Sequence, residues 1–159
     1  MTKQEALPLR FVLGALGLLA LLSQAVLLPR IAGEYAAAYP EVAYLAAPYV
    51  VAAIAAIACF EVALLAGWQI LTAVVADGAL TPGATKWANV LAFSVGLTGM
   101  TLAGICTHAG SVAGIGGPAM LFGALAGAAL IAAAVVLRIR LLRLSTQPAP
   151  EVGGLIAGT

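Results

Sequence analysis

The stretch from Pro48 to Asp77 constrains the fold of this chain more than any other part of the sequence. It reads PYVVAAIAAIACFEVALLAGWQILTAVVAD, and the carboxylate of Glu61 lies close to its middle. A helix of about twenty apolar residues crosses the hydrocarbon core of a bilayer, so a run of this length predicts a transmembrane helix that tilts or protrudes at one end. Glu61 would then lie near the midplane of the membrane.

The composition agrees with a membrane protein and argues against an ordinary soluble domain. Of the 159 residues, 64% are hydrophobic and 8% are charged, which is typical of polytopic membrane proteins. The few basic residues fall at the ends of apolar runs and form no patch interleaved with aromatic residues, so nothing suggests a nucleic-acid partner. The lipid bilayer is the partner that the composition indicates.

Three further apolar runs accompany this stretch, and together they predict an all-α, polytopic membrane protein. The four predicted spans cover about residues 10–29, 48–76, 86–107 and 119–137. They form a single transmembrane domain over residues 1–144. The tail over residues 145–159 is rich in Pro, Gly and Ser, and we expect it to be disordered. The first run is longer than the apolar core of a signal peptide and further spans follow it, so we expect it to be retained.

The segments between the spans carry helix and turn signals. Residues 30–47 predict a short interfacial helix broken at Pro40, with tyrosines at the level of the lipid headgroups. Thr81 before Pro82 predicts an N-cap with proline at the first helical position, so we expect the third helix to begin there. The glycine-rich connection from His108 predicts a flexible loop, and it has no phosphate-binding fingerprint.

Basic residues at the span ends predict the orientation of the chain. With both termini in the cytoplasm, the outer side holds only Arg30 and the inner side holds the other six: Lys3, Arg10, Lys86, Arg138, Arg140 and Arg143. Cytoplasmic flanks carry the excess of Lys and Arg, so we predict a multi-pass protein of the bacterial plasma membrane with cytoplasmic N and C termini. Short connections favour antiparallel neighbours and hence an antiparallel four-helix bundle.

Small residues mark the faces on which these helices are expected to pack. Lipid is as apolar as leucine, so helices in a bilayer associate through close contact of small residues and through polar contacts. The glycines at suitable spacing are Gly14 and Gly17 on the first span, Gly96 and Gly99 on the third, and Gly123 and Gly127 on the fourth. They predict either packing within the chain or contact with a second subunit, and the sequence leaves both open.

The carboxyl group of Glu61 is the main candidate for a functional group. It shares a helical stripe with Leu65, Trp68 and Thr72, with Gln69 at the flank, and we predict that this stripe faces the bundle interior. At similar depth the other spans offer Gln24 and Thr98 but no cation. Desolvation without a countercharge predicts a neutral, hydrogen-bonded carboxylic acid at pH 7. Glu61 is therefore either a site for a proton or cation, or an acid that ties helices together through Gln24 or Thr98.

The remaining reactive side chains predict no catalytic, cofactor or metal site. His108 follows Cys106 closely, but a metal site needs three or four ligands and the chain has no other histidine. Cys59 and Cys106 differ in predicted depth by several helical turns, so we expect no disulfide between them. A membrane enzyme would require His108 and Glu61 to converge despite their difference in depth. The sequence therefore favours a protein that is not an enzyme.

The segment from Trp68 to Leu97, WQILTAVVADGALTPGATKWANVLAFSVGL, resembles the middle of a bacterial four-helix membrane family, domain-of-unknown-function family 2975. The resemblance lies in a long second span that ends in a polar-Gly-x-hydrophobic-Thr-Pro turn, here DGALTP from Asp77 to Pro82. Leu80 stands where the family pattern has an aromatic residue. The similarity covers about residues 8–144. It implies a small plasma-membrane protein that works with a regulator or another membrane protein, and it supplies no catalytic residues.

Two functions remain open at this point. The first is a partner, sensor or regulatory subunit that binds another membrane protein or further copies of itself. The second is a small proton-coupled transporter or channel in which Glu61 exchanges a proton and an oligomer forms the pathway.

Overall fold

The structure of this chain is a computed structural model that describes residues 3–77, 82–114 and 117–145. All regular elements in these ranges are helical, so the all-α prediction is confirmed. Four of the described helical segments are long and apolar enough to cross a membrane. These segments are Ala6–Ala38, Pro40–Ala76, Gly83–Val112 and Pro118–Arg143.

The first helical segment continues beyond the predicted end of its span at residue 29. It consists of α1 (Lys3–Leu22), a π-helical turn η1 (Ser23–Leu27) and α2 (Leu28–Ala38). Proline lacks an N–H group, and its ring clashes with the carbonyl group four residues earlier in a regular helix. In η1 the N–H group of Leu28 instead donates to the carbonyl oxygen of Ser23, five residues earlier. This wider turn lets the helix pass through Pro29 without ending.

The predicted break at Pro40 is confirmed. Tyr39, at the end of α2, has φ −131° and ψ 73°, which is outside the helical region and fits the restriction on a residue before proline. A 3-10 helix, η2, follows over Pro40–Leu45 and leads directly into α3. The predicted separate interfacial helix over residues 30–47 is therefore wrong in its first half, because this half is the end of the first long helical segment.

Proline lies at or near the start of each later helix, where its missing N–H group costs nothing. α3 covers Ala46–Asp77 with Pro48 in its first turn, α4 covers Pro82–Thr107, and α5 covers Pro118–Ser145. The predicted start of the third helix at Pro82 is confirmed, whereas the N-cap residue Thr81 lies outside the described residues. α5 extends past residue 137 because its arginines and leucines are good helix formers. Of the predicted tail, only Ser145 is described, and it ends α5.

The connection from α4 to α5 begins with helical structure instead of the predicted loop. A second π-helical turn, η3 (His108–Val112), follows α4 directly. The N–H group of Ala113 donates to the carbonyl oxygen of His108 at 3.0 Å. Gly114 then has φ +66°, a left-handed conformation that glycine adopts readily and that ends the helix.

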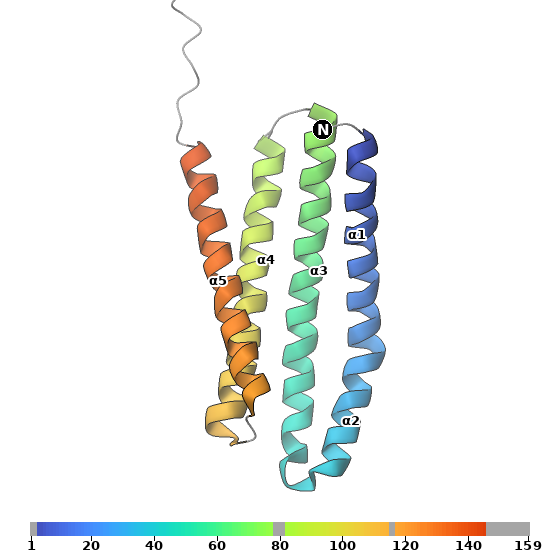
Figure 1. The fold of residues 1–159 in the computed structure, drawn as a ribbon, viewed down its shortest axis with the longest axis vertical. Coiled ribbons are helices and arrows are strands. Elements are labelled where there is room, and N and C mark those ends of the chain that lie inside the picture. Colours follow the sequence, from blue (N-terminus) through green and yellow to red (C-terminus); the bar gives the residue numbers. More distant parts are fainter. Residues whose placement is uncertain (1–2, 78–81, 115–116, 146–159) are drawn as a thin grey trace, which may run out of the picture.

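The helices lie in an open row and not in the predicted bundle. In Figure 1 the chain descends through α1 and α2, returns through α3, descends through α4 and returns through α5. Within the described residues, α3 contacts both α1 and α4, and α5 contacts α4, but α1 contacts neither α4 nor α5. The chain therefore buries one or two sides of each helix and leaves both faces of the row uncovered.

Most of the buried residues between these helices are alanines. The buried residues of the three later long helices are mainly Ala56, Ala63, Ala66 and Leu71 on α3, Ala84, Ala88 and Ala92 on α4, and Ala134 on α5. Small side chains let helix backbones approach closely, which is the main source of packing energy between helices in lipid. Most large apolar side chains point outward, as expected for surfaces that face acyl chains.

Candidate functional site

The carboxyl group of Glu61 on α3 is bound by the amide group of Gln24 in η1. Gln24 Nε2 donates to both carboxyl oxygens, at 3.1 Å to Oε1 and 3.3 Å to Oε2. Both residues are partly buried. Gln24 Oε1 is buried and has no hydrogen-bond partner among the described residues. The contact joins the first helical segment to α3, and it leaves one polar atom unsatisfied directly beside the carboxyl group.

A second polar contact joins α1 to α3 nearer to the end of the row where the N terminus lies. The guanidinium carbon of Arg10 lies 5.8 Å from the ring centroid of Trp68, in the geometry of a cation–π contact. Arg10 Nη2 is also 3.5 Å from Thr72 Oγ1. Thr72 is eleven residues from Glu61 on α3, or about 16 Å along the helix axis. Arg10 is therefore too far away to act as a countercharge for Glu61.

The prediction that the Glu61 stripe faces a bundle interior is wrong. Leu65 is 63% exposed and Trp68 is 38% exposed, and Gln69 is exposed as well. The buried face of α3 instead carries Ala63 and Ala66. An open row has no central interior, so the stripe lies along the edge of the contact with α1. Within it, Glu61, Trp68 and Thr72 have polar or cation–π contacts with the first helical segment.

Thr98, the other predicted partner of Glu61, joins α4 to α3 through the backbone. Its hydroxyl group donates to the carbonyl oxygen of Ala56 at 3.3 Å and to that of Ser94, on its own helix, at 2.9 Å. The Thr98 hydroxyl group thus hydrogen-bonds to backbone carbonyl oxygens and not to the carboxyl group of Glu61. Of the two predicted hydrogen-bond partners of Glu61, Gln24 therefore contacts the carboxyl group, whereas Thr98 contacts the backbone of α3 at Ala56.

His108 pairs with Tyr49 at the opposite end of the helices. Its Nδ1 atom lies 2.8 Å from the Tyr49 hydroxyl oxygen, and the two rings pack edge to face with centroids 5.9 Å apart. Tyr49 precedes Glu61 by twelve residues on α3, or about 18 Å along the axis. His108 and Glu61 therefore do not converge. Cys59 and Cys106 are both free thiols, as predicted.

The predicted packing glycines lie in the contact between α4 and α5. A Cβ atom on Gly99 would lie 2.7 Å from the carbonyl oxygen of Gly127, and one on Gly96 would lie 3.4 Å from Cβ of Ala134. A Cβ atom on Gly123 would clash with Sγ of Cys106. These glycines therefore pack within the chain, which is one of the two alternatives left open by the sequence. By contrast, a Cβ placed on Gly14 or Gly17 would have no atom of another described helix within 4 Å.

Two features of this site were missed by the sequence reasoning. One is the π-helical turn that holds Gln24, for which Pro29, five residues later, was the available signal. The other is the contact between Arg10 and Trp68, because Arg10 was considered only as a flanking charge and Trp68 only as part of the Glu61 stripe. Comparing the depths of cations and aromatic rings on neighbouring spans would have suggested this contact.

Comparison with known proteins identifies a family but no characterised relative. The family model described as "Protein of unknown function (DUF2975)" matches residues 30–151. The match includes the segment from Trp68 to Leu97 on which the sequence resemblance rested, and it begins later than the predicted extent of residues 8–144. No curated protein and no solved structure matches the chain.

Proposed function

We propose that this chain, which belongs to the DUF2975 family of proteins of unknown function, is a non-enzymatic membrane protein that acts as a regulatory or sensor subunit for another membrane protein. The four long apolar helices support a multi-pass membrane protein. The distribution of basic residues favours the plasma membrane with both termini in the cytoplasm. The partner we propose is a transmembrane helix of a different protein.

The open row is the observation that carries this proposal. α1 lies at one edge of the row, where it contacts α3 but neither α4 nor α5 within the described residues. Gly14 is exposed and has open space around it, whereas Gly99 of α4 and Gly127 of α5 already pack against each other. Helices in lipid pair through such small residues. An edge helix with an exposed glycine that no described helix covers, held to its neighbour by side-chain contacts, is suited to pack against a helix from another protein.

Crosslinking in intact membranes tests this proposal. A photoreactive amino acid at Leu18, which is 60% exposed and lies one turn from Gly14 on the same face, should give a discrete adduct with one other membrane protein. The same group at Phe122, which is 68% exposed on α5, should give only lipid adducts. Gly14→Leu should abolish the Leu18 adduct, because its side chain would hold the partner helix away. Lipid adducts alone from Leu18 would contradict the proposal, and an adduct between two copies of this chain would replace a foreign partner with a homo-oligomer.

The unsatisfied oxygen of Gln24 favours a second candidate function, reversible proton binding at Glu61. In the structure the Gln24 amide nitrogen donates to the carboxyl group while Oε1 remains without a partner. If Glu61 is protonated and the amide rotates by half a turn, the carboxyl O–H group can donate to Oε1. A single amide rotation would thus match the site to either protonation state, as a proton-coupled transporter or channel requires.

Glu61→Gln should abolish proton flux in proteoliposomes if the chain moves protons, because an amide cannot exchange a proton in this range of pH. Helix content measured by circular dichroism should stay unchanged, since glutamine keeps the size and hydrogen-bonding capacity of the side chain. Glu41→Gln is the matched control, because Glu41 lies exposed in η2 and away from the Gln24 contact. Equal flux through the wild-type and Glu61→Gln proteins would exclude a transport role for this carboxyl group.

A further inference from the structure

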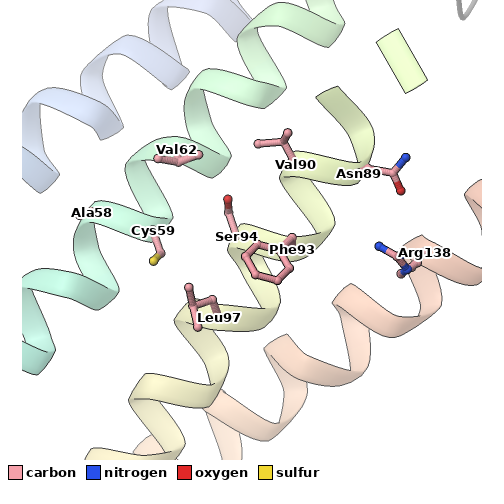
Figure 2. Close-up of a pocket in the computed structure, with 9 residues that line it drawn as sticks. All are labelled: Ala58, Cys59, Val62, Asn89, Val90, Phe93, Ser94, Leu97 and Arg138. Carbon is pink, nitrogen blue, oxygen red and sulfur yellow. The ribbon is translucent and has the colours of Figure 1, made fainter. Parts of the chain in front are cut away.

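A groove of about 570 Å³ crosses the face of α4 between α3 and α5. Its lining includes Cys59 and Val62 of α3, Val90, Phe93 and Leu97 of α4, and Arg138 of α5. Figure 2 shows these side chains around the open space. The groove is distinct from the Glu61 site, because it involves neither α1 nor the contact between Gln24 and Glu61. Most of its lining is apolar.

The polar groups of the groove are unevenly placed. Arg138 and Asn89 lie near each other at one end (Figure 2). Arg138 is exposed and has no hydrogen bond or ion pair with any described residue. The Asn89 amide group donates one hydrogen bond to the carbonyl oxygen of Thr85, at 3.2 Å. A carboxamide has two N–H groups, so the second can donate to a ligand. This end of the groove therefore presents a cation and a hydrogen-bond donor.

The depth of the groove matches one leaflet of a bilayer. Asn89 and Leu97 are eight residues apart on α4, or about 12 Å along the helix axis, and half of the hydrocarbon core is about 15 Å thick. The cationic end lies toward the ends of α4 and α5 where Lys86, Arg140 and Arg143 also occur. The apolar end lies toward the middle of the helices. A ligand that fits has one anionic group and a long apolar chain.

We propose that this groove binds one anionic phospholipid of the cytoplasmic leaflet. The headgroup phosphate binds the Arg138 guanidinium group, whose planar fork suits phosphate oxygens, and accepts a hydrogen bond from the second amide N–H of Asn89. One acyl chain lies along Phe93 and Leu97 toward Cys59. Basic pockets between transmembrane helices on the cytoplasmic side are a known means of binding anionic headgroups. The inference depends on membrane insertion of the four helices and not on the partner proposed above.

Simple snorkelling of arginine to the membrane surface is the competing explanation, and Arg140 distinguishes the two. Arg140 has the same charge, lies on the same helix two residues further on and is exposed. Two residues rotate a side chain by about 200° around a helix, and Arg140 is not among the residues that line the groove. If anionic lipid is attracted only by general charge, both arginines should contribute equally to lipid binding. If the lipid binds in the groove, only Arg138 should contribute.

Lipid competition measures this difference. The full-length protein is placed in nanodiscs with equal amounts of phosphatidylglycerol and phosphatidylcholine of identical acyl chains, and retained lipids are counted by native mass spectrometry. Wild-type protein should retain one phosphatidylglycerol in preference. Arg138→Gln should lower that preference about fivefold, the effect of one basic residue near an anionic headgroup, and Arg140→Gln should leave it unchanged. Equal retention of the two lipids by wild-type protein, or equal losses in both variants, would overturn the proposal.

Alkylation of Cys59 tests the acyl-chain part of the groove without depending on lipid counting. Cys59 lines the apolar end and is partly exposed, whereas Cys106 is buried. Phosphatidylglycerol should slow modification of Cys59 by a membrane-permeant maleimide, and phosphatidylcholine should not. Arg138→Gln should remove the protection, and helix content by circular dichroism should show that this variant is folded. An alkylation rate that does not depend on the headgroup would show that the groove holds only bulk lipid.

Discussion

Gly127→Ala should destabilise the contact between α4 and α5, whereas Gly104→Ala should not. A Cβ atom on Gly127 would lie 2.7 Å from the carbonyl oxygen of Gly99 and 2.7 Å from the backbone nitrogen of Ala103. Backbone atoms cannot rotate away, so the two helices must separate. Overpacking of this kind costs about 1–3 kcal/mol. We expect a corresponding loss in the free energy of unfolding, measured by circular dichroism during titration of detergent micelles with dodecyl sulfate.

Gly104→Ala is the matched control for this effect. Gly104 also lies within a long helix, α4, but a Cβ atom placed there has no atom of another described element within 4 Å. Both substitutions gain the higher helix propensity of alanine, about 1 kcal/mol, so the difference between the two variants isolates the clash. If Gly127→Ala proves as stable as Gly104→Ala, α4 and α5 do not pack through these glycines.

Removal of Gln24 or Glu61 alone should be more harmful than removal of both. Gln24→Leu leaves the carboxyl group without its amide donor, and Glu61→Leu leaves a partly buried amide unpaired. We expect each to cost about 1–2 kcal/mol in the free energy of unfolding. In the double variant two apolar side chains face each other, which is close to neutral for a pair of matched shape. The same dodecyl sulfate titration should therefore give a double-variant cost well below the sum of the two single costs.

Gln69 provides the control for this cycle. It is also a glutamine on a long apolar helix, but it is exposed on α3. The costs of Gln69→Leu and Glu61→Leu should add, because these residues share no contact in the described structure. Additive costs for Gln24→Leu and Glu61→Leu as well would mean that the amide and the carboxyl group do not interact in the folded protein.

The features that depend on residue order along a single helix could be predicted from the sequence. The four long helices follow from runs of apolar residues, and the start of α4 follows from Pro82. Gln24 could be nominated as a partner of Glu61 because residue counts place both at similar depth and few other polar residues occur there. Polar side chains at the same depth in a membrane tend to hydrogen-bond to each other. A short list of polar residues at that depth was therefore enough to predict the partner of Glu61.

The errors arose where the result depends on how helices are arranged around one another. Leu65 was expected inside a bundle and is 63% exposed, because the row does not close. Pro29 was expected to end the first helix, but the π-helical turn before it relieves the steric clash. The local pattern does not show whether the row closes, and Pro29 is compatible both with a helix end and with a π-helical turn before it. The face that each helix buries depends on which neighbours it has, and a helical turn can add one residue at little cost.

The close packing of α4 against α5 has a consequence for biosynthesis. Synthesis runs from the N terminus at about 5–20 residues per second, so about 1–6 s pass between the synthesis of Gly99 and that of Gly127. During this time Gly99 has no partner on α5. The best-packed pair is thus completed last. α1 leaves the ribosome first, yet it acquires its contacts only when α3 brings Glu61 to Gln24. The helix made first therefore spends the longest time without neighbours from its own chain, and during that time the side that later packs against α3 is uncovered.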